Sequence, residues 1–109
     1  MVDVFKIKRG DTLPVLAVTL QYANGSAIDL NNGSVFFNMA NADTLVAYAS
    51  GLCVITGSTA GQVEYRWTGS PDTYTSGNYY GEFEMIWAGS RMTLPVDNSL
   101  KIVIFEDYN

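Results

Sequence analysis

Glu82 and Glu84, two residues apart, are the side chains in this sequence best suited by type and spacing to acid–base chemistry. On one β-strand both would point to the same face, about 7 Å apart at roughly 3.3 Å per residue. Glycosidases use paired carboxylates about 5–5.5 Å or 6.5–9.5 Å apart across a cleft, usually from different strands. Neighbouring glutamates on a solvated sheet face are far more common, so we expect a surface pair rather than a catalytic one.

Other side chains that could do chemistry are sparse and isolated. Cys53 is the only cysteine and the chain has no histidine, so we expect a buried structural thiol rather than a nucleophile. Asp97-Asn98 and Glu106-Asp107 could offer oxygens to Ca²⁺, but no EF-hand or other dense ligand spacing surrounds them. The sequence also has no phosphate-binding glycine loop and no Ser-His-Asp set. We therefore expect no catalytic, cofactor or metal site, and a protein that is not an enzyme.

Composition limits the class of partner. A chain of 109 residues predicts one domain, residues 1–109, and its 48% hydrophobic content can fill a core without disulfides. A net charge of −5 argues against nucleic acid, because phosphate binding needs a basic surface. No apolar run is long enough to span a membrane and no signal peptide begins the chain, so we expect production in a cytoplasm. Charged residues make up only 16%, against about 25% in ordinary domains, which indicates that some surface faces other protein.

The two glutamates fall in residues 76–95, which predict a β-hairpin with a long first arm. One face of this arm is apolar, at Tyr79, Gly81, Phe83, Met85 and Trp87. The opposite face carries Tyr80, Glu82, Glu84 and Ile86. Residues 88–90 supply a short turn, and the second arm resumes a period-two apolar face at Met92, Leu94 and Val96.

Short strands separated by turn residues fill the rest of the chain. We expect them at residues 2–8, 13–22, 34–39, 51–56, 62–68 and 100–104, with a brief return strand at Ile28 and Leu30. Asn24-Gly25 predicts a type I′ hairpin turn, and residues 40–49 are the least clear segment. Eight or nine short, mostly antiparallel strands without a helix predict an all-β sandwich or barrel.

Residues 76–81 favour the immunoglobulin-like form of the β-sandwich. They are similar to the corner before strand F of that fold, in which a tyrosine, here Tyr79, bonds back to the backbone. Gly81 stands where an antibody domain has its second cysteine, and Trp67 lies too close to Tyr79 to be the usual strand C tryptophan. The sequence thus predicts an immunoglobulin-like sandwich but not an antibody domain.

Aromatic residues are numerous and divide into two groups. We expect the structural core to include Tyr79, Phe83, Met85, Trp87 and Trp67. Exposed tyrosines, for which Tyr74, Tyr80 and Tyr108 are the best candidates, could stack on sugars or anchor a protein interface. The candidate partner-docking surface is Tyr80, Glu82, Glu84, Ile86 and Tyr74.

An ordered set of segments resembles the N-terminal domain of the baseplate upper protein family of tailed bacteriophages. The segments are residues 5–14 (FKIKRGDTLP), 18–20, 24–25, 28–30, 61–67 (GQVEYRW), 77–84 (GNYYGEFE) and 93–95, followed by an isoleucine-rich last strand. The resemblance implies an immunoglobulin-like sandwich that serves as a virion assembly module and docks onto other virion proteins. In that family a C-terminal extension carries host recognition, whereas this chain ends at Asn109, so a small stand-alone virion subunit fits better.

We therefore expect a non-enzymatic bacteriophage structural protein: a capsid decoration, neck, or tail or baseplate accessory subunit. Its partners would be capsid, portal, neck or tail subunits, with homo-oligomers possible and no nucleic acid or membrane partner. It would be assembled in the host cytoplasm and reside in the virion. The alternative is a carbohydrate-binding or host-surface-binding module that uses exposed tyrosines and tryptophans.

Overall fold

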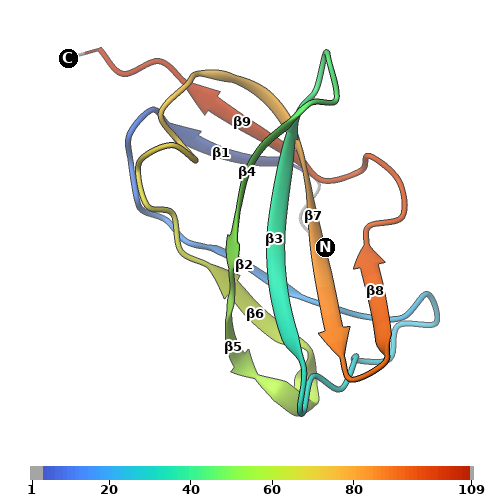
Figure 1. Cartoon of the computed structure of the whole chain (residues 1–109). Coiled ribbons are helices and arrows are strands. Elements are labelled where there is room, and N and C mark those ends of the chain that lie inside the picture. Colours follow the sequence, from blue (N-terminus) through green and yellow to red (C-terminus); the bar gives the residue numbers. More distant parts are fainter. Residues whose placement is uncertain (1–3, 109) are drawn as a thin grey trace.

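The computed structural model describes residues 4–108 as a sandwich of two β-sheets (Figure 1). The larger sheet contains β1 (Val4–Lys8), β3 (Ser34–Asn41), β4 (Ala47–Leu52), β7 (Gly77–Trp87), β8 (Ser90–Leu94) and β9 (Lys101–Phe105). The smaller sheet contains β2 (Leu16–Thr19), β5 (Val54–Gly57) and β6 (Gln62–Tyr65). Ser58–Ala60 forms a 3₁₀ turn. Val2, in the first predicted strand, lies outside the described residues.

The strand order confirms the predicted immunoglobulin-like sandwich. The smaller sheet runs β2-β6-β5, and the larger runs β1-β9-β7-β3-β4, with β8 also paired to β7. These orders correspond to strands B-E-D and G-F-C-C′ of an immunoglobulin domain, with strand G divided into β8 and β9. The paired strands are antiparallel except for β1 and β9, which run parallel.

A cluster of aromatic rings lies between the two sheets. The ring of Phe37 on β3 lies 4.7 Å from that of Tyr65, 5.7 Å from Trp67 and 5.2 Å from Phe83, measured between centroids. The predicted core residues Tyr79, Phe83, Met85 and Trp67 are buried, and Trp87 packs partly buried against them. The period-two pattern therefore identified the inward faces correctly.

The tyrosine corner is present. The Tyr79 hydroxyl donates to the carbonyl oxygen of Thr75 at 2.8 Å, four residues upstream. Gly81 occupies the position of the second cysteine of an antibody domain. No side chain fits there, because a Cβ at Gly81 would lie 2.8 Å from Phe37 Cε1. In this sandwich the aromatic core stands where antibody domains place their disulfide.

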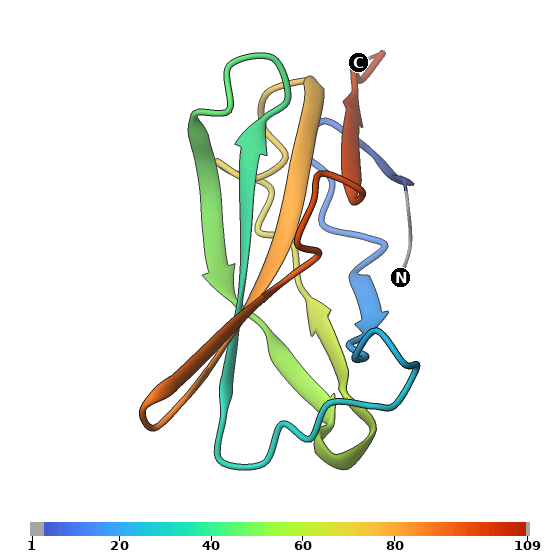
Figure 2. The same ribbon diagram turned by 90° about the vertical axis from the view of Figure 1, so that its right-hand side faces the viewer.

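Strand β7 exchanges neighbours along its length. Its first residues, from Gly77 to Tyr80, pair with β9, and those from Phe83 to Trp87 pair with β8. Figure 2 shows the tip of the β7–β8 hairpin standing out from the rest of the molecule. The prediction for Val96 was wrong: β8 ends at Leu94, and Val96 is 91% exposed in the loop that follows.

Three local predictions near the N-terminal half need correction. The strand predicted at residues 13–22 covers only Leu16–Thr19, and Ile28 and Leu30 are buried without forming a strand. The turn at Asn24-Gly25 is not type I′, because Gly25 has a positive φ (+90°) and Asn24 does not. Leu16, Val18, Leu20, Ile28 and Leu30 still face the core, whereas Leu13 is 70% exposed.

The strand predicted at residues 51–56 is divided between the two sheets. Strand β4 belongs to the larger sheet and β5 to the smaller one, and the chain passes between them at Cys53. The Cys53 backbone N–H donates to the Val35 carbonyl at 2.8 Å, and its thiol is buried, as predicted. The chain thus links the two sheets directly at one side of the sandwich.

Candidate protein-docking surface

The outer face of the larger sheet carries four of the five predicted docking residues. Tyr80, Glu82, Glu84 and Ile86 alternate along β7 with core residues, so all four point away from the smaller sheet. Glu82 is exposed, Ile86 is 38% exposed, and Tyr80 and Glu84 are half-buried. The structure therefore brings these four together as one continuous row.

Tyr74, the fifth predicted docking residue, lies elsewhere. It precedes β7 in the loop after β6, where the Arg9 guanidinium carbon lies 4.5 Å from the centre of its ring. The Arg9 Nε–H also donates to the Tyr74 carbonyl at 2.6 Å. Tyr74 is exposed, at 54%, as predicted, but the structure does not place it beside the other four predicted docking residues, because Arg9 holds it against the start of the chain.

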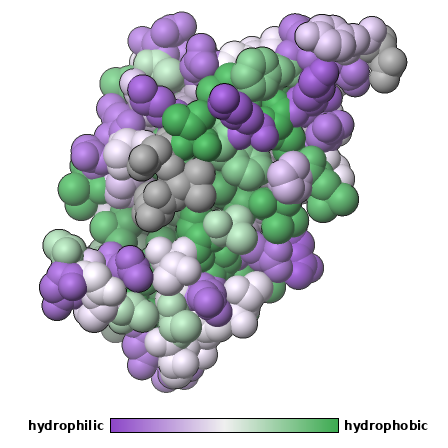
Figure 3. Space-filling view, turned by 180° about the vertical axis from the view of Figure 1, so that it is seen from behind, coloured by the Kyte–Doolittle hydropathy of each residue, from purple (hydrophilic) through white to green (hydrophobic). Residues whose placement is uncertain are grey.

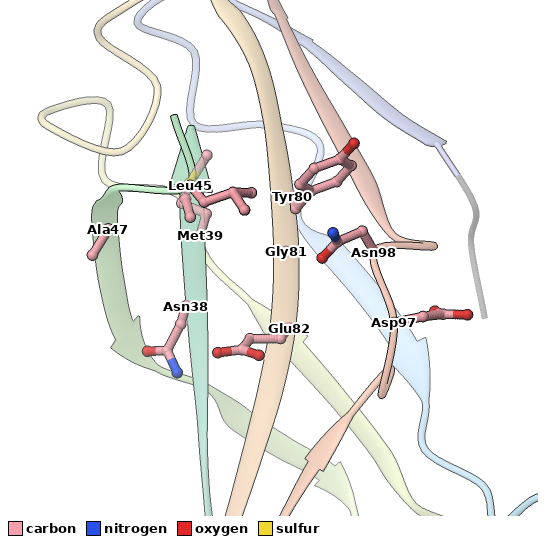
Figure 4. Close-up of a pocket in the computed structure, with 10 residues that line it drawn as sticks. Asn38, Met39, Leu45, Ala47, Tyr80, Gly81, Glu82, Asp97 and Asn98 are labelled. Carbon is pink, nitrogen blue, oxygen red and sulfur yellow. The ribbon is translucent and has the colours of Figure 1, made fainter. Parts of the chain in front are cut away.

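A groove of about 370 Å³ lies on this face beside Tyr80 and Glu82. Its walls come from β3, β7, the turn of residues 42–46 and the loop of residues 95–100; the lining residues are Asn38, Met39, Ala40, Leu45, Ala47, Tyr80, Gly81, Glu82, Asp97 and Asn98. In Figure 4 Leu45 reaches toward Tyr80 and the Glu82 carboxylate extends toward Asn38. The groove thus combines two carboxylates, two amides and exposed apolar side chains.

The two glutamates of the row differ in their pairing. Glu84 Oε2 lies 3.1 Å from Arg91 NH1 on the neighbouring β8. Among residues 4–108, no cationic group lies within ion-pair distance of Glu82. Glu82 therefore presents an uncompensated negative charge to solvent, whereas the charge of Glu84 is already balanced.

Leu45 is held at the rim of the groove in a strained backbone conformation. Its φ is +61°, in the left-handed region that costs a non-glycine residue roughly 1–2 kcal/mol. The turn enforces this conformation: Leu45 N–H donates to the Asn41 carbonyl at 2.8 Å, and Asn41 Oδ1 accepts from Asp43 N–H at 2.8 Å. The side chain is nonetheless 61% exposed, so burial within the chain does not explain why a leucine stands here.

Leu45→Gly should raise the free energy of unfolding by about 0.5–1 kcal/mol, because glycine adopts a positive φ without strain. Urea unfolding would measure the change. Val46→Gly is the matched control, since Val46 is equally exposed, at 64%, but has no positive φ. Val46→Gly should lower the free energy of unfolding. A loss of equal size in Leu45→Gly and Val46→Gly would contradict backbone strain at Leu45.

Asp72 is a buried polar residue whose burial no sequence pattern predicts. Asp72 is only 1% exposed. Its Oδ2 accepts hydrogen bonds from the Tyr65 hydroxyl at 2.7 Å and from Thr68 N–H at 2.8 Å. Its Oδ1 accepts from Gly69 N–H at 3.0 Å. Burial, followed by the hydrogen bond to Asp72 and its charge, raises the pKa of Tyr65. These bonds fix the loop after β6, so Asp72 is structural rather than part of the docking face.

Three buried groups, the Cys53 thiol and the hydroxyls of Tyr65 and Tyr79, make the free energy of unfolding depend on pH in the alkaline range. Burial raises the pKa of Cys53 from 9.0 to about 12. Burial, with the nearby Tyr48 adding to it, raises the pKa of Tyr79 from 10.0 to about 12, and the pKa of Tyr65 rises in the same direction. The folded state therefore keeps protons that the unfolded state releases above about pH 9.

Stability should consequently fall as pH rises from about 9 to 12, by about 1.4 kcal/mol per pH unit for each such group. Below pH 9 the unfolded chain keeps the same protons, so this contribution is then fully present. Urea unfolding between pH 7 and 11 would measure the slope. Cys53→Ala should flatten it between pH 9 and 10, where Cys53 titrates first, and a stability independent of pH up to 11 would contradict the prediction.

In residues 4–108 no group of three or more histidine, cysteine, aspartate or glutamate residues is placed to hold a metal ion. No helix within these residues has the length and apolar character needed to cross a membrane.

Comparison with known proteins adds no relative. No protein-family model matches the chain, and no curated protein matches it. The indications of function are therefore the fold, the docking face and the resemblance of the sequence segments.

Proposed function

We propose that this protein is a non-enzymatic structural subunit of a bacteriophage virion that binds other virion proteins through the outer face of its larger sheet. The observation that carries the proposal is the row on β7, where Tyr80 and Glu82 line a groove with an exposed, strained leucine at its rim and Ile86 continues the row along the strand. Strained backbone is retained where function requires it, and exposed apolar groups around polar ones are typical of protein interfaces.

The virion assignment rests on the resemblance to the baseplate upper protein family together with the immunoglobulin-like strand order. In this proposal the subunit is assembled in the host cytoplasm and remains in the particle as a decoration, neck, or tail or baseplate accessory protein. Its partners are capsid, portal, neck or tail subunits, without nucleic acid or membrane. The unpaired Glu82 and the net charge of −5 favour a partner surface that is basic.

A carbohydrate-binding role is the second candidate, and the positions of the tyrosines weigh against it. Tyr108 is 91% exposed, but Lys8 Nζ lies 4.0 Å from the centre of its ring. Tyr74 is covered in the same way by Arg9. A sugar needs an open ring face on which to stack, and here cations already occupy one face of each of these rings.

Mass spectrometry of purified, DNA-filled particles tests the virion assignment. We expect the protein in stoichiometric amounts, and its absence from particles would overturn the proposal. Glycan-array binding by the wild-type protein would favour the carbohydrate role instead.

Charge reversal tests the docking face itself. Glu82→Lys should reduce incorporation into particles about tenfold or more, because it places a cation against a basic partner surface. Asp29→Lys makes the same change in net charge at an exposed position outside the docking face, and it should leave incorporation unchanged. Wild-type incorporation of Glu82→Lys would contradict this choice of surface.

A further inference from the structure

The opposite edge of the larger sheet carries a strip of lysines and apolar residues. Parallel pairing of β1 with β9 places Val4 beside Lys101, Lys6 beside Val103, and Lys8 beside Phe105. Each row therefore joins one lysine to one apolar residue. We call these six residues the basic strip.

The strip is exposed and its charges are not balanced within the chain. Val4 is 44% exposed and Phe105 is 46% exposed, and all three lysines are exposed. In the part of the chain from Val4 to Tyr108, none of the three lysines lies within 4.0 Å of a carboxylate. Lysines on an edge strand discourage pairing with another strand, but this role does not require an apolar neighbour in every row.

The groove carries the complementary features. Glu82 supplies an unpaired carboxylate, and Leu45 and Ala47 supply exposed apolar surface beside it. The basic strip and the groove share no residue. Figure 3 shows that hydrophobic residues also gather over the middle of the face opposite Figure 1, so apolar exposure alone does not select a partner. The combination of opposite charges with apolar neighbours on the basic strip and the groove does select a partner.

We propose that the basic strip of one copy of this chain docks into the groove of the next copy. Lys6 would pair with Glu82, and Val4 or Phe105 would cover Leu45. The basic strip and the groove both lie on the outer face of the larger sheet, where Lys101 is paired opposite Tyr80, so two copies related by a two-fold axis can make the contact twice and close as a dimer. The inference rests on the proposed function, and it adds a second copy of this chain to the virion proteins that the docking face binds.

Sedimentation velocity on the purified wild-type protein from 20 µM to 1 mM tests the contact. In 50 mM NaCl we expect a dimer at the highest concentrations, with association at least tenfold weaker in 500 mM NaCl. Glu82→Lys and Lys6→Glu should each weaken association at least tenfold. The double variant, which exchanges the two charges, should recover most of it.

Controls separate this contact from nonspecific charge effects. Asp29→Lys should associate like the wild type, and circular dichroism with thermal unfolding should show that every variant is folded. Leu45→Gly should weaken association while keeping or raising stability.

Three results would overturn the inference: a wild-type monomer at 1 mM in low salt, no recovery in the double variant, or an equal loss in Asp29→Lys. A monomeric protein that is still incorporated into particles would reject only the contact between copies. Absence from particles would instead reject the proposed function.

Discussion

Asp72→Ala should lower the free energy of unfolding by about 3–5 kcal/mol, more than any other single change considered for this protein. Three donors lose their acceptor at once: the Tyr65 hydroxyl and the backbone N–H groups of Thr68 and Gly69. The Tyr65 hydroxyl is buried and the bonds from the two backbone N–H groups are partly buried. A buried donor left without a partner costs about 1–3 kcal/mol, and bonds to a charged acceptor are at the upper end. Loss of the buried negative charge offsets part of the sum. Urea unfolding would measure the change, with a melting temperature lower by at least about 12 °C.

Asp29→Ala is the control for this result. Asp29 is also an aspartate in a loop, and its Oδ1 accepts one backbone N–H, that of Asn31, at 2.9 Å. It is exposed, so water can replace the carboxylate and the loss should stay below about 1 kcal/mol. The loss of stability for Asp72→Asn should lie between those of Asp72→Ala and Asp29→Ala. The asparagine oxygen can still accept a hydrogen bond, but its N–H₂ group would face a donor that the carboxylate had accepted from. Equal losses for Asp72→Ala and Asp29→Ala would show that the buried bonds contribute little.

Gly81→Ala should destabilise the protein by about 1–3 kcal/mol, although alanine is normally tolerated better than glycine in a strand. The added Cβ would lie 2.8 Å from Phe37 Cε1 and 3.2 Å from Leu100 Cδ2. The ring of Phe37 has no room to move, because Tyr65 and Phe83 pack against it. Equilibrium unfolding in urea would measure this loss as well.

A double-mutant cycle with Phe37→Leu identifies the cause. Leucine lacks the ring atoms that meet the new Cβ, so Gly81→Ala should cost less than half as much in the Phe37→Leu background. Phe37→Leu alone should itself be destabilising, since it opens space among the aromatic rings. Simple additivity of the two changes would contradict a clash between residues 37 and 81.

The inward faces of the strands could be predicted because burial follows a period of two. Val35, Phe37 and Met39 alternate with half-buried residues, and Val63 and Tyr65 follow the same rule. The exchange of sheets at Cys53 could not be predicted in this way. Residues 52–55 are all apolar, so the sequence shows no break at Cys53, while hydrogen bonding to different partners divides the strand.

The docking face was only partly predictable, for the same reason. One strand fixes the row from Tyr80 to Ile86, and the sequence pattern identified it. The groove needs two further segments, around Leu45 and Asn98, that lie far apart in the sequence and meet only in the fold. The burial of Asp72 was equally hidden, because Gly69-Ser70-Pro71-Asp72 has the composition of an exposed turn.

The parallel pairing of β1 with β9 has a mechanical consequence. Val4 lies opposite Lys101 and Lys8 opposite Phe105, so the start of β1 and the end of β9 are at opposite ends of the pair. A force that pulls these two ends apart slides one strand along the other and loads the hydrogen bonds of the pair together. In an antiparallel pair pulled from one end, the bonds would instead open one after another. The β1–β9 pair therefore works as a shear clamp that joins the first and last strands of the sandwich.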